Sequence, residues 1–565
     1  MENQIIKKSV EQILSLSIAL FLCHSCNKAP DSPITQDELL QKVDSLLVNA
    51  NEFIAPGTAV LVIKNGDILL NKGYGYANLE HEVPIGPNTV FDLASLSKQF
   101  TGFAISLLVE QGKIALDDDI RQYIPELPDF EHTITIEHLL HHTSGIRDWT
   151  STLPLAGWSF DDVISYDQIL RMAYAQKELN FVPGSQYSYS NTGYNILAEL
   201  VQRVTGRFFA QWTYESIFLP LGMTDTRFLD DHRQVVPDRA NGYYRIEDGP
   251  YQISPNNLTA LGSSSLFSTT TDMAKWMVHL ISPKAKIASV VERMYGRGTL
   301  NNGEVISYAF GLEIDEFRDT KRVLHTGSWA SFTSCMILFP EHDLSVLVLN
   351  NHQKNVYATA NEIASLYLPD AQVNNVEEGQ GIYEPFELPT ETLDQFTGTY
   401  RLGPAWYITV FREGNKIWGQ TMDEHIFPMT AESDSIFRIP TNGGQTITFY
   451  RDISGTATHM EHTGMAAPKI KESSSVVPKN IIQYTGSYVS EELNTEYHVT
   501  YKDQQLKLRH FRHGELDLTA FGNDVFRSDR WFIKSIEFYR NKNNEIIGFY
   551  TTNERARNQW FQKTN

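Results

Sequence analysis

The stretch Phe91-Asp-Leu-Ala-Ser-Leu-Ser-Lys-Gln-Phe100 is the most informative part of this chain. It runs into apolar residues at helical spacing, which predict a helix over Gln99–Glu110 that stops at Gly112. Residues three apart on a helix are neighbours, so the Ser95 hydroxyl and the Lys98 amine should face the same point. Free N–H groups at the helix start would suit an oxyanion, and burial of Lys98 would favour its neutral, proton-accepting form. The alternative is a helix cap beside a solvated lysine. The spacing alone is not specific, because Ser25 and Lys28 have it too.

A second candidate is Tyr189-Ser-Asn191, which lies in a turn-rich stretch before a predicted helix over Ile196–Val204. Loops on a rigid scaffold often present catalytic groups. A tyrosine and an asparagine two residues apart could point into one cleft, where the phenol relays a proton and the amide orients a substrate carbonyl. The same spacing recurs at Tyr76/Asn78 and Tyr539/Asn541, so turn formation and packing are the alternative explanation.

The third candidate is His325-Thr-Gly327, followed by Ser328 and a predicted strand that ends near Pro340. Gly327 would let another part of the backbone approach, and the Ser328 amide could donate to an oxyanion. A histidine on an edge strand is the alternative. The similar triplet His462-Thr-Gly464 falls opposite Thr551–Asn553 in the internal repeat described below, so we expect it to be a β-strand without a chemical role.

Around these motifs, residues 36–368 alternate strand-like runs with amphipathic helices and predict one mixed α/β domain. It should open with a hairpin, Thr58–Ile63 and Ile68–Leu70, joined at Lys64-Asn-Gly-Asp67. Residues 369–390 break both periodicities and are interpreted as a linker.

Beyond the linker the chain repeats itself. Leu393-Asp-Gln-Phe-Thr-Gly-Thr-Tyr400 matches Ile481-Ile-Gln-Tyr-Thr-Gly-Ser-Tyr488, and Ile447–Arg451 matches Ile536–Arg540 at nearly the same offset. Each copy alternates aromatic and polar residues and is rich in turn formers. We therefore expect two small antiparallel β-barrels or sandwiches, at residues 391–472 and 480–565.

The N-terminus reads as an export signal. Lys7 and Lys8 precede the apolar stretch Ile13–Leu22, which is too short for the roughly 20 residues of a membrane-spanning helix. Residues 1–26 are therefore predicted to be a secretory signal. Ser25 before Cys26 is similar to a lipoprotein cleavage site, although Cys23 stands where such sites favour leucine, and Cys26 is the candidate lipidation residue.

Composition favours catalysis on a small molecule or short peptide. The 565 residues carry 47 Lys+Arg against 68 Asp+Glu, a net charge of −21. Nucleic acids and anionic lipids need clustered basic residues, so neither is expected as a partner, and membrane contact would come only from a lipid on Cys26. The three cysteines offer no disulfide framework, and no zinc or phosphate-loop spacing is present in the sequence, so no cofactor is expected.

Taken together, Ser-x-x-Lys, Tyr-x-Asn and His-Thr-Gly in this order resemble the penicillin-recognising serine hydrolases, in the branch of class C β-lactamases, D-aminopeptidases and esterases. Further similar stretches are His138–Ile146, Pro220–Phe228 and Ser268–Ala274. The resemblance implies an α/β (α+β) domain in which an antiparallel sheet is flanked by helices and joined to a helical lobe. It also implies two trailing barrels, as in the D-aminopeptidases, and a structural role for His138–Ile146.

By the same resemblance, Ser95 is the nucleophile, and Lys98 and Tyr189 share the proton transfers. Asn191 contacts the substrate amide or Lys98, and the backbone N–H groups of Ser95 and Ser328 form the oxyanion hole. His325, Thr326, Gly327 and Ser328 line the substrate site. Relatives that bind a substrate carboxylate usually have lysine where His325 stands, and a histidine is mostly neutral near pH 7.

We therefore expect an exported serine hydrolase, in the periplasm or cell envelope, that acts on an ester or a peptide-like amide through an acyl-enzyme. β-Lactamase or D,D-carboxypeptidase activity is the first alternative. The second, from another class, is a binding or sensor protein that has kept the fold. A turnover measurement separates the last from the others.

Overall fold

The computed structural model describes residues 35–47, 54–247, 249–369, 386–422, 424–439, 446–462, 465–470 and 480–564. The predicted signal peptide with Cys26, and most of the predicted linker, lie outside the described residues. Helix α2 (Gln36–Leu47) belongs to a separate compact unit and is described by itself, whereas everything from Asn49 onward forms one compact unit.

Residues 54–369 form the domain that carries the three sequence motifs, called the catalytic-type domain below. It is built on a six-stranded antiparallel sheet in the order β10-β11-β12-β13-β1-β2. The predicted hairpin is confirmed, with Asn65 and Gly66 both at positive φ in its turn. β1 is buried on both faces, so its sequence is continuously apolar rather than alternating. The strands are β1 (Thr58–Lys64), β2 (Asp67–Tyr74), β10 (Glu313–Phe317), β11 (Thr320–Trp329), β12 (Phe332–Phe339) and β13 (Leu344–Asn350).

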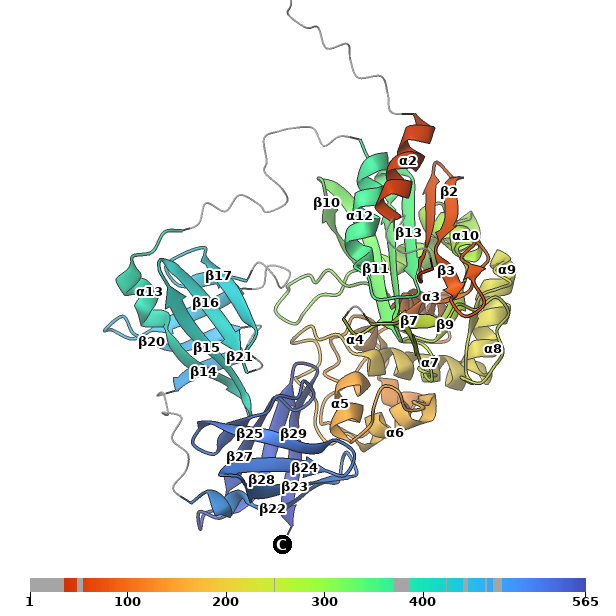
Figure 1. Cartoon of the computed structure of the whole chain (residues 1–565). Coiled ribbons are helices and arrows are strands. Elements are labelled where there is room, and N and C mark those ends of the chain that lie inside the picture. Colours follow the sequence, from red (N-terminus) through yellow and green to blue (C-terminus); the bar gives the residue numbers. More distant parts are fainter. Residues whose placement is uncertain are drawn as a thin grey trace, which may run out of the picture. The chain divides into compact units, whose positions relative to one another are not determined.

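Helices cover this sheet. α10 packs against β1 and β2, and α12 packs against β12 and β13, as Figure 1 shows. The remaining helices and short strands complete this domain, and the turn before α3 packs against β11 and β12. The helices are α3 (Ser97–Glu110), α4 (Ile136–Leu140), α5 (Trp149–Leu155), α6 (Tyr166–Ala175), α7 (Asn191–Thr205), α8 (Phe209–Thr213), α9 (Leu219–Leu221), α10 (Thr270–Ile281), α11 (Ala288–Met294) and α12 (Val356–Tyr367). The short strands are β3 (Tyr76–Asn78), β4 (Val83–Pro84), β5 (Phe91–Asp92), β6 (Arg227–Phe228), β7 (Gly242–Tyr244), β8 (Gln252–Ser254) and β9 (Leu266–Ser268).

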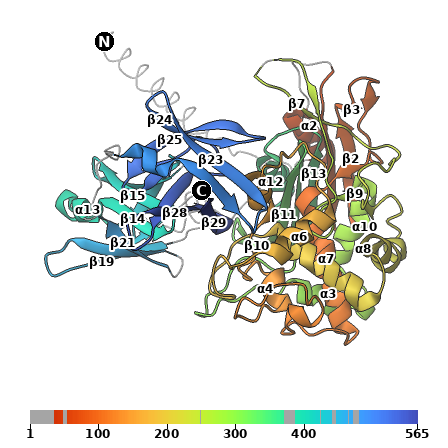
Figure 2. The same ribbon diagram turned by 90° about the horizontal axis from the view of Figure 1, so that it is seen from below.

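Two closed eight-stranded antiparallel barrels follow, which confirms the expected β-units (Figure 2). After α13 (Thr390–Phe396), the first barrel comprises β14 (Gly398–Gly403), β15 (Trp406–Glu413), β16 (Lys416–Thr421), β17 (Ile426–Ala431), β18 (Ile436–Arg438), β19 (Thr446–Arg451), β20 (Ala457–His462) and β21 (Met465–Ile470). The second comprises β22 (Gly486–Ser490), β23 (Thr495–Lys502), β24 (Gln505–His510), β25 (Gly514–Gly522), β26 (Val525–Arg527), β27 (Ser535–Arg540), β28 (Ile546–Asn553) and β29 (Ala556–Thr564).

The repeat found in the sequence marks equivalent contacts in the two barrels. The Tyr400 hydroxyl donates to the Phe396 carbonyl at 2.7 Å, and the Tyr488 hydroxyl donates to the Tyr484 carbonyl at the same distance. The repeated glycine has φ of 139° in one barrel and 141° in the other, a conformation that favours glycine. Each tyrosine thus ties the first strand of its barrel to the turn before it.

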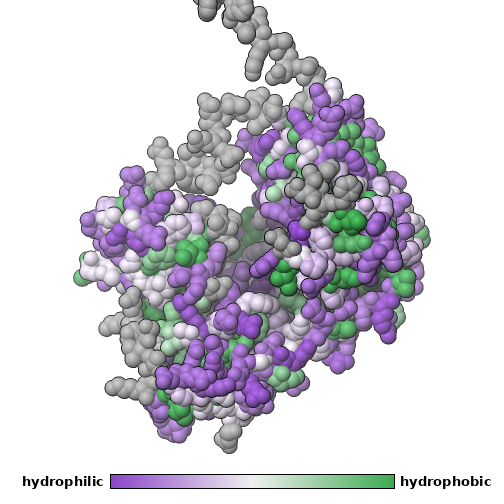
Figure 3. All heavy atoms as spheres, viewed as in Figure 1, coloured by the Kyte–Doolittle hydropathy of each residue, from purple (hydrophilic) through white to green (hydrophobic). Residues whose placement is uncertain are grey.

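The face shown in Figure 3 is mostly hydrophilic, with scattered hydrophobic residues, as the excess of acidic residues suggests. Among the helices of the described ranges, we find none with the length and apolar character to cross a bilayer.

Candidate active site

Ser95 lies on a tight turn between β5 and α3. Ala94 has a φ of 48°, in the left-handed region that a non-glycine residue rarely adopts. Two contacts hold it there: the Asp92 carboxylate accepts from the Ala94 N–H at 2.8 Å, and the Ser97 hydroxyl donates to the Ala94 carbonyl at 2.6 Å. Ser95 is therefore in a short 3-10 turn, and α3 begins at Ser97, two residues before the predicted start. Backbone strain of this kind is concentrated at functional sites.

Lys98 is fully buried one turn further along and meets the Ser95 hydroxyl. Its Nζ lies 3.1 Å from Ser95 Oγ, 2.7 Å from Asn191 Oδ1 and 2.7 Å from the Ser263 carbonyl oxygen. Desolvation holds the pKa of Lys98 well below its ordinary value, only partly offset by Asp148. The predicted proximity of Ser95 and Lys98 is thus observed, and the lysine is the buried one rather than the solvated alternative.

Tyr189 completes this cluster from the loop before α7. Lys98 Nζ lies 4.9 Å from the centre of its ring. Burial raises the pKa of Tyr189, while its hydrogen bond with Ser95 acts in the opposite direction. The loop is held by His142, whose ring contacts that of Tyr189 with centroids 4.2 Å apart and whose carbonyl accepts from the Ser188 N–H at 2.9 Å. The His138–Ile146 stretch therefore positions the tyrosine loop.

Asn191 is the first residue of α7, so the helix begins five residues before the predicted start. Its side-chain Nδ2 donates to both carboxylate oxygens of Asp148, at 3.2 and 3.0 Å. Asp148 is completely buried at the start of α5, where it also accepts from the Thr150 N–H. Sequence reasoning missed Asp148. The only local signal was an aspartate at a helix N-cap, which is common and is usually structural.

His325 is neutral and has protein partners at both ring nitrogens. Its Nδ1 lies 2.6 Å from the Thr326 carbonyl oxygen, which can only accept, so Nδ1 carries the proton. Its Nε2 then accepts from the Tyr308 hydroxyl at 2.9 Å. Burial lowers the pKa of His325 to about 3, with Lys98 adding to the effect. The residue at the third motif therefore supplies no cation.

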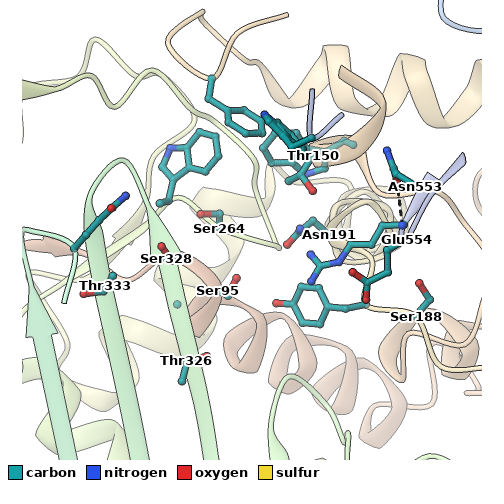
Figure 4. A pocket seen from close by; sticks show the side chains of 18 of the residues that line it. Ser95, Thr150, Ser188, Asn191, Ser264, Thr326, Ser328, Thr333, Asn553 and Glu554 are labelled. Carbon is teal, nitrogen blue, oxygen red and sulfur yellow. Dashed lines mark hydrogen bonds between the residues drawn. The ribbon is translucent and has the colours of Figure 1, made fainter. Parts of the chain in front are cut away.

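The rest of this motif lies on β11 beside the nucleophile. Thr326 and Ser328 line the same cleft as Ser95, and Figure 4 shows them on the strand next to it. A Cβ on Gly327 would lie 2.9 Å from the Ser95 backbone nitrogen and 2.5 Å from the Leu93 carbonyl oxygen. Glycine is thus needed for the strand to approach this turn so closely.

The second barrel contributes Arg555, from the turn between β28 and β29. Its guanidinium lies over the Tyr189 ring at 5.1 Å, and its Nη1 is 3.4 Å from Asp148 Oδ2. The Asp148 N–H in turn donates to the Arg555 carbonyl at 3.0 Å. No sequence pattern places the barrels against the catalytic-type domain, so this residue was also missed.

The resulting cleft has a volume of about 1590 Å³ and is lined by the catalytic-type domain and both barrels. One wall is aromatic, because Trp329 contacts Trp149 at 5.7 Å and Phe160 at 5.4 Å, and Phe160 contacts Trp531 at 5.7 Å. His462 ends strand β20, as expected, yet it also lines the cleft. Within the described ranges, we find no cluster of three or more His, Cys, Asp or Glu side chains suited to a metal ion.

Comparison with known proteins agrees with this geometry. Residues 49–368 match the family described as Beta-lactamase. Penicillin-binding protein 4* of Bacillus subtilis is 28% identical over 382 residues, which are 64% of this chain and 82% of the relative. D-aminopeptidase of Gluconobacter oxydans is 29% identical over 357 residues, which are 62% of this chain and 66% of the relative, just under two thirds.

Among solved structures, the octameric penicillin-binding protein homologue from Pyrococcus abyssi superposes with a TM-score of 0.53 at 21% identity, covering 84% of this chain and 98% of that one. The likeness shows the shared fold. Since the family match spans more than half of the chain, and the fold is the one expected, this protein belongs to the beta-lactamase family of serine hydrolases.

Proposed function

We propose that this protein forms an acyl-enzyme on Ser95 and hydrolyses an ester or a peptide-like amide. The observation that carries the proposal is the set of partners of Lys98. A neutral amine has two hydrogens and one lone pair, and Asn191 Oδ1 and the Ser263 carbonyl can only accept. Both hydrogens are therefore used, which leaves the lone pair for the Ser95 hydroxyl at 3.1 Å. A lowered pKa of Lys98 favours this neutral form.

In the proposed mechanism, Ser95 Oγ attacks the substrate carbonyl carbon while its proton moves to Lys98. The oxyanion would accept from the backbone N–H groups of Ser95 and Ser328. Collapse of the tetrahedral intermediate expels the alcohol or amine, which takes a proton by way of Lys98 and Tyr189. Water then attacks the ester on Ser95 and gives up a proton to the same pair, which releases the acid and restores the serine.

Neutral His325 is the main guide to the substrate. A lysine at this position would hold a carboxylate close to the reacting carbonyl, whereas His325 is uncharged and already bonded to Thr326 and Tyr308. This weakens the β-lactam and D-Ala-D-Ala alternatives. The D-aminopeptidase relative supports amides of D-residues as one substrate class to test.

The test is a substrate screen with p-nitrophenyl esters, D- and L-aminoacyl anilides and a chromogenic cephalosporin, using Ser95→Ala as the background. We expect Ser95-dependent turnover of an ester or aminoacyl anilide that exceeds turnover of the cephalosporin. Equal turnover in the wild type and in Ser95→Ala would contradict the hydrolase proposal. No turnover of any substrate would contradict it as well and would favour the binding alternative. A preference for the cephalosporin would move the assignment to a β-lactamase.

Export, with a lipid on Cys26, is a further proposal supported by the Lys7/Lys8 and Ile13–Leu22 pattern. The test is cell fractionation of the wild type beside Cys26→Ser. We expect the wild type in the membrane fraction and the variant in the soluble fraction. A soluble wild type with a mature N-terminus other than Cys26 would leave a cleaved signal without lipidation.

A further inference from the structure

Arg557, on strand β29 of the second barrel, is buried without an ion-pair partner. Only 8% of its surface is exposed, and no ion pair to it is found among the described residues. Its Nη1 donates to Gln186 Oε1 at 2.9 Å and lies 3.5 Å from Met465 Sδ. Its Nε has no hydrogen-bond partner in the described part of the chain. A buried charge is normally paired, so this arginine needs an explanation.

Aromatic rings hold the guanidinium in place. Trp406 of the first barrel lies 4.5 Å from it, and Phe181 of the catalytic-type domain lies 5.4 Å from it. Guanidinium groups are weakly hydrated and stack well on such rings. Burial lowers the pKa of Arg557 to about 10, so the group stays cationic near pH 7. A rigid, charged group is thus held where the three domains meet.

The orientation of the guanidinium suits an anion. The bonds to Gln186 and Met465 use Nη1, and Nε is buried without an acceptor among the described residues, so Nη2 is the nitrogen left to bind a ligand. A carboxylate oxygen can accept a charge-assisted hydrogen bond from such a nitrogen. The charged residue that acts on the pKa of Arg557 is Glu554, which is exposed and makes no ion pair with it.

Arg557 and Ser95 line the same cleft. At about 1590 Å³, that cleft exceeds the roughly 300–1,000 Å³ of ordinary small-ligand sites, so it suits an extended substrate. Arg557 comes from strand β29 of the second barrel and bonds Gln186, whereas Ser95 and Lys98 come from the turn before α3 and from α3 itself and bond each other.

We propose that Arg557 binds a carboxylate of the substrate, away from the bond that is cleaved. This inference rests on the proposed function of Ser95 and extends it to a substrate class: elongated esters or peptides with a free carboxylate. It is compatible with a neutral His325. That residue occupies the position that would bind a carboxylate close to the reacting carbonyl, whereas the carboxylate proposed here lies away from that carbonyl.

The experiment compares matched free and capped substrates of increasing length. One series is the p-nitrophenyl monoesters of dicarboxylic acids from succinic to sebacic acid, each beside its methyl-capped partner. The other is D-alanyl-oligoglycine peptides with a free C-terminal carboxylate, each beside its C-terminal amide. In the wild type, we expect the free acid to have a kcat/KM about ten- to hundredfold above its capped partner at one favoured length of one series.

Arg557→Gln should remove that advantage and leave the capped substrates nearly unchanged, and Arg557→Lys should restore part of it. Arg512→Gln is the matched control, because Arg512 also joins the second barrel to the catalytic-type domain, through Asp162, but does not line the cleft. It should leave the ratio of free to capped substrate as in the wild type.

Two kinetic results would overturn the inference. One is wild-type turnover of capped substrates with no preference for the free acid at any length. The other is an equal loss for both partners in Arg557→Gln, which shows a structural role. If Arg557→Gln does not fold, the wild-type series still decides. If no compound is hydrolysed, the proposed function fails. Calorimetric binding of the same pairs to Ser95→Ala then tests Arg557 separately. Equal affinity for the free and capped ligands would overturn the inference.

Discussion

Asp148 accepts two hydrogen bonds from the side-chain amide of Asn191, at 3.2 and 3.0 Å. Because a carboxylate only accepts, this contact fixes which end of the amide faces Lys98. Asn191 Oδ1 is thereby directed to the lysine at 2.7 Å. Asp148 makes neither of these contacts with Ser95 or Lys98 itself. It orients Asn191, whose Oδ1 accepts a hydrogen bond from Lys98.

Asp148→Asn should weaken the site without removing any of the three motifs. An asparagine can donate as well as accept, so the Asn191 amide would lose its single orientation. We expect at least a tenfold drop in kcat/KM for the best ester, and a changed pH profile because the Lys98 pKa depends on Asp148. Asp161→Asn, at another residue that lines the cleft, is the control and should stay near wild type. Unchanged kinetics in Asp148→Asn would remove this positioning role.

Ser95→Ala should abolish labelling by a fluorophosphonate probe, because the alcohol that attacks the phosphorus is gone. Its stability should change little, since a hydroxyl at a helix start contributes only about 1 kcal/mol. Gel fluorescence and a thermal melt measure the two effects together. Labelling that persists would place the nucleophile elsewhere.

Lys98→Ala and Tyr189→Phe should each slow acylation by at least about a hundredfold, the usual scale of general acid–base catalysis. The measurement is the single-turnover rate with a p-nitrophenyl ester. Tyr187→Phe offers a control tyrosine that lines the same cleft. Near-normal rates in both active-site variants would contradict the mechanism proposed above.

His325→Lys should shift selectivity toward β-lactams. The new cation could hold a carboxylate close to the acyl carbon, and a charge-assisted hydrogen bond contributes roughly 1.5–3 kcal/mol, or a ten- to hundredfold change in the ratio of kcat/KM values. In the wild type, cephalosporin turnover should not rise as pH falls through 6.5, because the pKa of His325 is about 3. A steep rise there would show a protonated imidazole at work.

Acid should destabilise the catalytic-type domain before its carboxylates titrate. Burial lowers the pKa of His325 to about 3 and that of His141 to about 4, whereas unfolded histidines titrate near 6.5. Between these values the unfolded chain binds protons that the native chain does not, so stability falls as pH drops from 6.5 toward 4. Each histidine should cost about 2 kcal/mol by pH 5. Thermal melts at pH 7.5 and 5.0 should show this loss, and His141→Asn should show less of it.

The sequence predicted the fold class and the repeated β-units because both leave periodic patterns. The spacing in Ser95-x-x-Lys98 is local, and a helix converts it directly into proximity. The approach of Tyr189 and His325 could be expected only from the family pattern, since both lie at least 91 positions from Lys98 and no local rule brings them together.

Asp148 and Arg555 could not be found in this way. Asp148 resembles an ordinary helix cap, and its contact with Asn191 depends on how α5 packs beside α7. Arg555 depends on the docking of one domain on another, which is set by surface shape and not by periodicity. The unpaired state of Arg557 is likewise visible only when its surroundings are known.

Arg555 and Arg557 follow Ser95 by about 460 positions in the chain. During synthesis, the serine, the lysine and the tyrosine loop are thus made long before the strand that carries Arg557. A catalytic-type domain folded at that stage would have its nucleophile and base but an open wall where the second barrel later docks. If Ser95 and Arg557 act as proposed, the order of translation would therefore separate the capacity to react from the capacity to select a substrate.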